Sequence, residues 1–405
     1  MASVIPTTAA MASSFSAAAV LGKEITGSET LAGLAVASMQ VGSVFATVPL
    51  ARRMARLGRR RGMVAGWSIG AVGAALAFVA AVADFYPLLV VGILGVGAGN
   101  ATNFAARFAA ADLAPEDRRA RAIGMLVWAA TVGAALGPTI ALGPAADLAR
   151  FAGLPELSGP YLLGTALFII GLSATQLWLR PDPLEVLGTI GDDPVRPASP
   201  MVVGRRIATV PAARLAVIAM LTGQAVMVGV MTMTPLHMEN GDHRLQVIGL
   251  VISVHVIGMY AFSPIVGWLV DRMGSHLIIG LGGVTLCIGA ETAAHTSAED
   301  SLGMFVGLML VGLGWSFGLI AGSAMLTGAF PVDQRVEVQG GADFIMTTSG
   351  AVAGLGAGAA VEAVGFHLLS HWAGLSALLL VAAAAAAWYT ARQERADRVS
   401  YRGAG

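Results

Sequence analysis

The sequence has little charge, almost no lysine and a single cysteine. Charged residues make up 12% of its 405 residues, whereas soluble domains contain about 25%. Lys23 is the only lysine, so nearly all basic charge is arginine. Because Cys287 has no partner in the chain, an internal disulfide, a cysteine zinc cluster and an iron–sulfur site are excluded. The polar segments are too short for a separate soluble domain, and the composition indicates one integral membrane protein.

Long apolar stretches fill the rest of the chain, of which 56% is hydrophobic. A helix needs about 20 apolar residues to cross the hydrocarbon core of a bilayer. The stretches show no alternation with period two, so the fold class is all-α and not a barrel. We predict twelve transmembrane helices, at 3–22, 30–51, 63–83, 86–111, 121–143, 160–179, 211–235, 247–270, 277–294, 302–328, 338–361 and 371–390.

The distribution of arginine predicts the orientation. The run "RRMARLGRRRG" at 52–62 holds six arginines in eleven positions, and cytoplasmic loops carry an excess of Lys and Arg. If the N-terminus is cytoplasmic, twenty basic residues face the cytoplasm and three face outward, so we expect both termini in the cytoplasm and the protein in the inner (cytoplasmic) membrane. The run is then a cytoplasmic loop between helices 2 and 3, next to the anionic headgroups of the membrane. Binding of nucleic acid is not expected, because no basic domain accompanies the run. The twenty are Arg52, Arg53, Arg56, Arg59, Arg60, Arg61, Arg118, Arg119, Arg121, Arg180, Arg196, Arg205, Arg206, Arg214, Arg272, Arg335, Arg392, Arg395, Arg398 and Arg402, against Lys23, Arg150 and Arg244 outside.

The two halves of the chain repeat each other at an offset of 216 residues. The segment "PEDRRARAIG" at 115–124 aligns with "PVDQRVEVQG" at 331–340, and glycines align without a gap across helices 2 to 5. Two parallel six-helix repeats place a substrate path between them. We therefore predict an N-terminal bundle at 1–179, a cytoplasmic linker at 180–208, a C-terminal bundle at 209–391 and a cytoplasmic tail at 392–405.

Together, the twelve helices, the repeat and the basic loops resemble the major facilitator superfamily over essentially the whole chain. Its loop signature is roughly G-x-x-x-D-R-x-G-R-R. The second-half copy, "GWLVDRMGSH", matches at Gly267, Asp271, Arg272 and Gly274, and the first-half copy, "ARRMARLGRR", keeps Arg56, Gly58, Arg59 and Arg60. Ala51 and Ala55 replace the Gly and Asp of the first copy, which puts its usual aspartate contact in doubt.

Helix 5 carries "GMLVWAATVGAALGP" at 124–138, which is similar to the antiporter signature of the family at Gly124, Gly133, Gly137 and Pro138. The resemblance implies antiport. The alternative is a packing groove, because small residues at this spacing let helices approach closely. Segments such as "HVIGMYAFSPIVGWLVDRMG" and "VQGGADFIMTTSG" are similar to bacterial twelve-helix permeases of unassigned substrate.

Arg107, His255 and Asp343 are ionisable residues within predicted helices, where such groups face a cavity or a partner. Arg107 and Asp343 are predicted at similar depth near the cytoplasmic ends of helices 4 and 11, so they can pair as an inner gate. The alternatives are that Arg107 extends to the headgroups, and that Asp343 is a half-buried proton carrier or a helix N-terminal acid. His255 in helix 8 can titrate near neutral pH or can be a packing histidine.

Neutral polar residues complete the predicted substrate and proton pathway. Asn100, Asn103, Gln224 and Trp315 can orient a substrate through hydrogen bonds. The segment "GVGAGN" follows no strand and "GKE" lacks the rest of a phosphate loop, so neither a dinucleotide nor ATP is expected as a cofactor. No metal-ligand spacing and no clustered catalytic set occurs, so we expect no metal, no cofactor and no enzymatic activity.

These features predict a monomeric secondary transporter that works by alternating access. The cargo is expected to be a small, partly hydrophobic organic solute, exported in exchange for protons. Uptake of a nutrient by proton symport or by facilitated diffusion is the alternative, and a non-transporting membrane receptor is a remote one.

Overall fold

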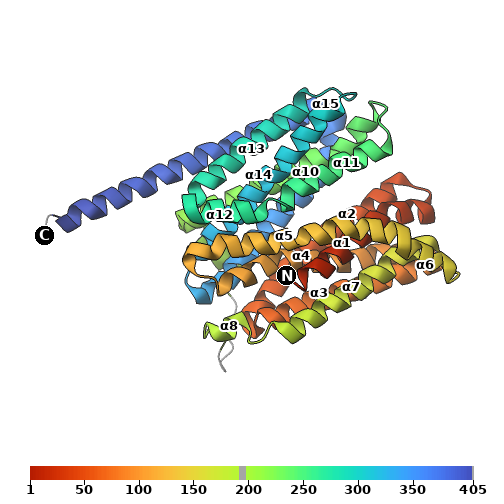
Figure 1. Cartoon of the computed structure of the whole chain (residues 1–405), viewed down its shortest axis with the longest axis horizontal. Coiled ribbons are helices and arrows are strands. Elements are labelled where there is room, and N and C mark those ends of the chain that lie inside the picture. Colours follow the sequence, from red (N-terminus) through yellow and green to blue (C-terminus); the bar gives the residue numbers. More distant parts are fainter. Residues whose placement is uncertain (191–197, 404–405) are drawn as a thin grey trace. The chain divides into compact units, whose positions relative to one another are not determined.

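The computed structural model describes residues 1–190 and 198–403, and these residues are almost entirely helical, with no strand among them. The fold is therefore all-α (Figure 1). Arg196 and the rest of 191–197, part of the predicted linker, lie outside the described residues.

Seven helices precede the linker, with short 3₁₀ or π turns between some of them. They are α1 (Val4–Thr26), α2 (Glu29–Leu57), α3 (Arg59–Ala83), α4 (Tyr86–Asp112), α5 (Arg119–Ile140), α6 (Ala146–Phe151) and α7 (Gly159–Trp178). The short helices α8 (Pro183–Val186) and α9 (Pro200–Thr209) begin within the predicted linker, on either side of 191–197. The remainder comprises α10 (Pro211–Glu239), α11 (Leu245–Tyr260), α12 (Ser263–Met273), α13 (Ser275–His295), α14 (Ser301–Gly328) and α15 (Val332–Gly403).

Eleven helical stretches in the described part of the chain are long and apolar enough to cross a membrane. The last, Val332–Thr390, is 59 residues long and contains both of the last two predicted helices. Its helix is interrupted at Gly365, where φ is 80° and ψ is 163°. Only glycine adopts such a conformation at little cost, so Gly365 forms the turn between the eleventh and twelfth crossings. The predicted all-helical membrane fold is confirmed.

Several predicted helix ends were wrong. The arginine run is not a loop, because α2 ends at Leu57 and α3 begins at Arg59, which leaves Gly58 alone between them. The eighth predicted helix is broken after Tyr260 into α11 and α12. The fifth continues past 143 through a π-helical turn at Ala141–Ala145 to Phe151. The extra turn follows Pro138 and contains Pro144, whose missing amide hydrogens disrupt regular helical bonding.

Helix ends follow the sequence repeat. The bounds of α2, Glu29 and Leu57, fall 216 residues before Leu245 and Met273, which begin α11 and end α12. The start of α3 and the end of α4 correspond in the same way to the start of α13 and the end of α14. The predicted domain boundaries at 179, 208 and 391 remain a prediction.

Residue contacts divide the chain into two compact units. The first unit comprises 1–114, 125–204 and 330–355, and the second comprises 115–124, 205–329 and 356–405. The start of α15, up to residue 355, therefore belongs with the first unit, and the connection from α4 to α5, with the start of α5, belongs with the second.

Close helix packing within each unit depends on glycine. A Cβ added at Gly73 of α3 would lie 2.7 Å from the Cα of Gly95 in α4. In the second unit, one added at Gly289 of α13 would lie 2.7 Å from the amide nitrogen of Val311 in α14. Both distances are below van der Waals contact, so only glycine allows these helices to lie so close together.

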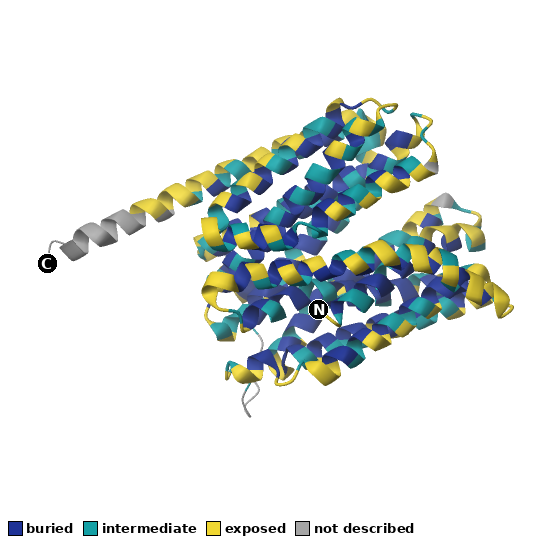
Figure 2. Cartoon of the chain, viewed as in Figure 1, coloured by how far each residue is buried: buried dark blue, intermediate teal, exposed yellow. Residues whose placement is uncertain are grey.

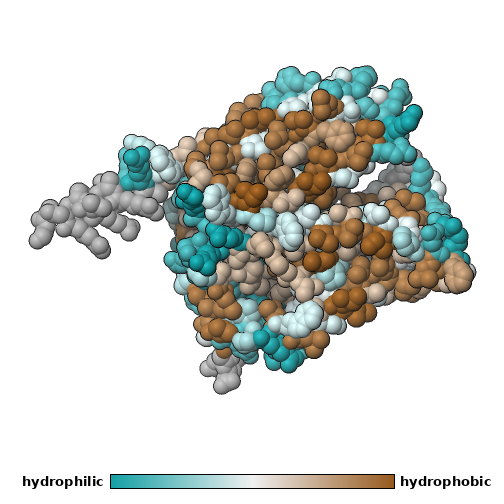
Figure 3. All heavy atoms as spheres, in the orientation of Figure 1, coloured by the Kyte–Doolittle hydropathy of each residue, from teal (hydrophilic) through white to brown (hydrophobic). Residues whose placement is uncertain are grey.

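Apolar side chains cover much of the outer surface of the helices. Exposed residues follow the outer faces of the helices (Figure 2), and many are large and hydrophobic, such as Phe45 at 75% and Leu250 at 57% exposure. Hydrophilic residues gather near helix ends, while the long helices carry hydrophobic ones (Figure 3). A surface of this kind matches a lipid environment.

Candidate functional site

A buried ion pair joins α4 to α15 within the first unit. Arg107 Nη2 lies 2.5 Å from Oδ1 of Asp343, and Nη1 lies 3.4 Å from Oδ2. The two residues are 1% and 2% exposed. The guanidinium also donates to the carbonyl of Phe104 and lies 4.3 Å from the ring centroid of Phe108. Arg107 therefore does not extend to the headgroups, and the prediction that Asp343 is half-buried was wrong.

Asp343 is also not a helix N-terminal acid. We predicted a start at 338, but α15 begins at Val332, so Asp343 lies about three turns inside the helix. The helix dipole acts mainly on the first turn. Arg107 is therefore the main source of charge stabilisation for this carboxylate.

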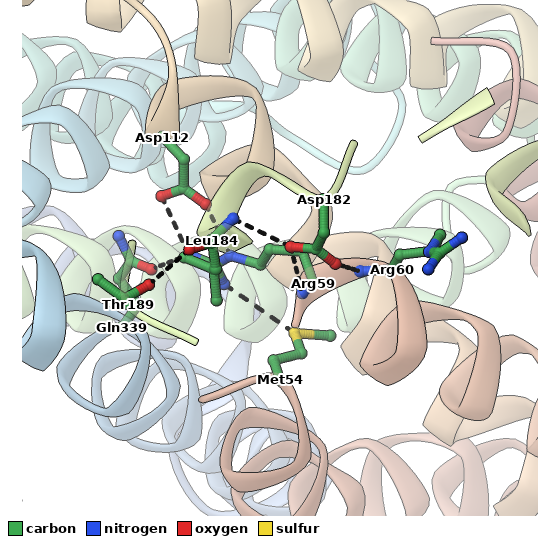
Figure 4. Close-up of polar contacts among 8 residues, drawn as sticks. All are labelled: Met54, Arg59, Arg60, Asp112, Asp182, Leu184, Thr189 and Gln339. Carbon is green, nitrogen blue, oxygen red and sulfur yellow. Dashed lines mark hydrogen bonds and ion pairs between the residues drawn. The ribbon is translucent and has the colours of Figure 1, made fainter. Parts of the chain in front are cut away.

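A second buried arginine, Arg59, lies at the start of α3 (Figure 4). Its Nε donates to Asp112 Oδ2 at 2.8 Å, and its Nη2 donates to Asp112 Oδ1 at 3.3 Å and to Gln339 Oε1 at 2.5 Å. Arg59 is 1% exposed. A buried guanidinium is tolerated only when its charge and its donors are paired. Arg59 is thus part of the protein interior, not of a solvated basic loop.

Asp182, directly before α8, caps the first turn of α3. Its carboxylate accepts hydrogen bonds from the backbone amides of Arg59, at 3.2 Å, and Arg60, at 2.7 Å. The preceding Gly58 has φ 95°, and a Cβ there would lie 2.5 Å from Asp182 Oδ2. The signature glycine is therefore required both by its backbone conformation and by the approach of the carboxylate.

The second-half copy of the loop signature makes a different contact. Asp271, at the end of α12, accepts hydrogen bonds from the backbone amides of Ala120, at 2.9 Å, and Arg121, at 3.0 Å. These amides lie in the first turn of α5, where a carboxylate is favoured by the helix dipole. Gly267 lets α12 approach this turn, because a Cβ there would lie 2.8 Å from the Cα of Arg121. Arg272 instead lies over the ring of Trp268, 5.3 Å from its centroid.

The two repeats are therefore unequal. Ala55 replaces the aspartate in the first copy, while the Arg59 cluster and the Arg107–Asp343 pair have no charged counterparts in the second. At the offset of 216, the positions matching Arg59, Asp112, Gln339, Arg107 and Asp343 are Ser275, Gly328, Ile123, Ser323 and Val127. The side chains of Arg56 and Arg60 take no part in the contacts described for Arg59, Asp271 and Arg272. Gly274, also in the signature, has no side chain.

The two predicted asparagines of α4 contact different helices. Asn100 Nδ2 donates to Ser43 Oγ of α2 at 3.0 Å. Asn103 Oδ1 lies 3.0 Å from Trp67 Nε1 of α3 and 2.7 Å from Thr7 Oγ1 of α1. An indole N–H can only donate, so Trp67 fixes the orientation of the Asn103 amide. The buried Nδ2 of Asn103 then has no hydrogen-bond partner among the described residues.

In the second unit, the predicted residues Gln224, His255 and Trp315 are all buried. Trp315 Nε1 donates to Gln224 Oε1 at 2.8 Å, and the ring of Tyr260 packs edge-on against the indole. His255 Nδ1 lies 2.8 Å from the carbonyl oxygen of Leu308, which can only accept. The proton is therefore on Nδ1. Nε2 is buried without a partner in the described part of the chain.

The residues of the described ranges offer no cluster of three or more His, Cys, Asp or Glu side chains that could hold a metal ion.

Comparison with known families identifies the architecture. The family model described as "Major Facilitator Superfamily" matches residues 1–245 and 243–404. The chain belongs to the major facilitator superfamily.

Related sequences carry the names of transporters. The chain is 34% identical over 380 residues to the "Uncharacterized MFS-type transporter YdeG" of Bacillus subtilis, covering 92% of this chain and 87% of that protein. It is 29% identical over 354 residues to the "Riboflavin transporter RfnT" of Brucella anthropi, covering 87% and 85%.

Solved structures agree on the fold. The crystal structure of the transporter FucP in the outward conformation has a TM-score of 0.70 at 16% identity, covering 96% of this chain and 99% of that one. The human organic anion transporter MFSD10 has a TM-score of 0.69 at 14% identity, covering 94% and 99%. The protein is thus a multi-pass membrane transporter of the facilitator superfamily that binds small-molecule substrates, and it is not an enzyme.

The antiporter-like glycines of this transporter lie at helix contacts. A Cβ at Gly133 of α5 would lie 2.7 Å from the amide nitrogen of Ala9 in α1, and one at Gly137 would lie 2.8 Å from the carbonyl oxygen of the same residue. Gly124, in the second unit, faces the backbone of Ser263 in α12. Pro138 lies inside α5, three residues before the π-helical turn. All three glycines serve close packing, whichever direction transport takes.

Sequence reasoning missed Asp112, Asp182 and Gln339. Asp112 lies three residues before "PEDRRARAIG" and Gln339 lies within "PVDQRVEVQG", but their partner Arg59 is 53 and 280 residues away in the chain. The available sequence signal was an acid directly after an apolar helix. This signal indicates Asp112 but does not identify Arg59 as its partner.

Proposed function

We propose that this transporter exports a small, partly hydrophobic organic solute in exchange for protons, by alternating access between its two six-helix repeats. It acts as a monomer in the cytoplasmic membrane with both termini in the cytoplasm. The observation that carries the proposal is the buried Arg107–Asp343 pair. Its members come from opposite repeats of the sequence, and its acid is a group that a proton can neutralise.

The pair supplies a physical link between proton binding and conformation. While Asp343 is ionised, its charge holds Arg107 and keeps α4 beside the first half of α15. A proton on the carboxylate leaves the buried guanidinium without its counter-charge, which costs about 3–5 kcal/mol when one member of a buried pair is lost. A loss of about 3 kcal/mol changes a two-state ratio by roughly 150-fold. The pair is therefore an inner gate that opens on protonation.

Each unit offers a buried polar group without a partner among the described residues that a substrate can satisfy. In the first unit it is the Nδ2 donor of Asn103, and in the second unit it is the Nε2 acceptor of His255. Unpaired buried groups of this kind cost free energy until a ligand satisfies them. Gln224 and Trp315, which are hydrogen-bonded to each other, are further candidate contacts in the second unit. Asn100 holds α4 against α2 through Ser43.

Uptake of a nutrient is the second candidate. One relative is named a riboflavin transporter, so riboflavin is a compound to test. The first experiment therefore measures the thermal stability of the purified protein against metabolites and drugs, with riboflavin among them. A stabilising compound is then followed in proteoliposomes under an imposed pH gradient. We expect the gradient to drive accumulation of the compound against its concentration, in the direction opposite to proton flow. Accumulation in the same direction as protons would make it a symporter, and equal passive equilibration with and without the gradient would contradict proton coupling.

Asp343→Asn isolates the coupling step. The amide keeps the shape of the side chain but cannot ionise, so exchange of labelled for unlabelled substrate should continue while gradient-driven accumulation is lost. Asp147→Asn is the matched control, because the side chain of Asp147 is 68% exposed and pairs with Arg150 at the surface. Equal gradient-driven accumulation by the Asp343 variant and the control would contradict the role of Asp343.

The topology is tested separately in a Cys287→Ser background. Arg61 is exposed at the start of α3 and Phe151 is 90% exposed at the end of α6. In intact cells an impermeant maleimide should label Phe151→Cys and should label Arg61→Cys only after permeabilisation. The reverse pattern would invert the orientation.

A further inference from the structure

A cavity lined by three arginines lies at the end of α2. Its volume is about 590 Å³, and its lining is Pro49, Arg52, Arg53, Arg56, Leu57 and Ser199. The lining contains no acidic side chain. Six residues from two distant parts of the first unit therefore enclose a positively charged space.

The arginines of the cavity differ from the other arginines of the same run. The guanidinium of Arg59 is held by Asp112 and Gln339. Arg52, Arg53 and Arg56, by contrast, have no hydrogen bond or ion pair to any described residue. Arg52 and Arg56 are one helical turn apart, and like charges at that spacing repel each other. Among the described residues, no acidic side chain pairs with these three guanidinium groups, so an anionic ligand can satisfy them.

The other lining residues fit a ligand that is both anionic and apolar. The Oγ of Ser199 accepts from the amide of Val202 at 3.4 Å, so its hydroxyl hydrogen can donate to a further oxygen. Pro49 and Leu57 add apolar surface. Arginine forms two parallel hydrogen bonds with phosphate, and the cavity is far larger than a phosphate ion alone. It lies at the end of α2, a helix that is long and apolar enough to cross a membrane.

We propose that this cavity binds the phosphate and glycerol of an anionic phospholipid and thereby connects the end of α2 to Ser199, at the start of α9. The class of ligand is a phosphodiester with a net negative charge. The site is independent of the substrate pathway and of proton coupling.

The test uses native mass spectrometry of the purified full-length protein titrated with phosphatidylglycerol or with phosphatidylcholine of the same acyl chains. We expect one phosphatidylglycerol to bind at least about tenfold more tightly than phosphatidylcholine, since each basic residue near an anionic surface contributes about 1 kcal/mol. Arg52→Gln with Arg53→Gln and Arg56→Gln should abolish that preference. Ser199→Ala should weaken it by a few fold.

The matched control removes the same charge from Arg61, Arg205 and Arg214, which are exposed and outside the cavity lining. This control should keep the tenfold preference, and the thermal stability of both triple variants is measured to show that they are folded. Equal loss of preference in both triple variants would overturn the site in favour of a diffuse electrostatic effect. Inorganic phosphate displacing phosphatidylglycerol at millimolar concentration would overturn the assignment to lipid, because the cavity would then recognise a free anion.

Discussion

Arg107→Gln leaves the carboxylate of Asp343 buried beside a neutral amide, and the fold should lose stability as a result. Both residues are at most 2% exposed, and removing one member of a buried pair costs about 3–5 kcal/mol. At about 2–4 °C per kcal/mol for a unit of this size, the melting temperature of the purified protein should fall by about 6 °C or more. The matched control is Arg150→Gln. The side chain of Arg150 is 61% exposed and pairs with Asp147 and Glu156 at the surface, so this change should cost about 1 kcal/mol at most.

A double-mutant cycle separates the ion pair from general damage at the site. Arg107→Gln combined with Asp343→Asn removes both charges and leaves two amides that can bond to each other. We therefore expect the double variant to lose less stability than the two single variants lose together. The difference, which is the coupling free energy, should be about 1–3 kcal/mol. Additive losses, or a fall in Arg107→Gln no larger than in Arg150→Gln, would refute the reasoning.

Three further predictions concern packing and hydrogen bonds. Gly133→Ala should destabilise the protein by about 1–3 kcal/mol, measured as a lower melting temperature, because its Cβ would overlap the backbone of α1. The control Gly249→Ala, whose Cβ would have nothing within 4 Å, should be neutral or stabilising. Equal effects of the two changes would contradict the close packing. Trp315→Phe should lower the stability of the fold by about 1–3 kcal/mol, because it leaves Gln224 unpaired. Adding Gln224→Leu should recover part of that stability, and no recovery in thermal melts would refute the bond. Asp271→Ala should cost about 1 kcal/mol through loss of the cap on α5, and Asp271→Asn should lose less; an equal loss would exclude capping.

More of the fold than of the candidate site could be predicted from the sequence. Apolar stretches of membrane length and the 216-residue repeat predict the helices, because lipid forces each crossing to satisfy its own backbone. The break after Tyr260 and the start of α15 at Val332 were not predictable, since hydropathy does not report hydrogen bonding at helix ends. Arg107 and Asp343 stood out as charges within apolar runs, and their predicted pairing matches the contact in the structure.

The Arg59 cluster could not be found from the sequence alone. Arg59 looked like one of six equivalent arginines, and what separates it from Arg61 is only which side of α3 faces the protein. Its acceptors come from other helices, and the second repeat offers no acidic counterpart to indicate them. Asymmetry between repeats is therefore invisible to an argument that relies on their similarity.

The distances along the chain that separate Arg59 from its acceptors impose an order on biosynthesis. Asp112 follows Arg59 by 53 residues, Asp182 by 123 and Gln339 by 280. At about 5–20 residues per second of translation, Arg59 waits on the order of 15–60 s for its last partner. During that time Asp112 alone can neutralise a guanidinium that ends up fully buried. The start of α3 therefore acquires its cap only after the sixth crossing has been made, and the first bundle cannot reach its final state on the ribosome before residue 182 has emerged.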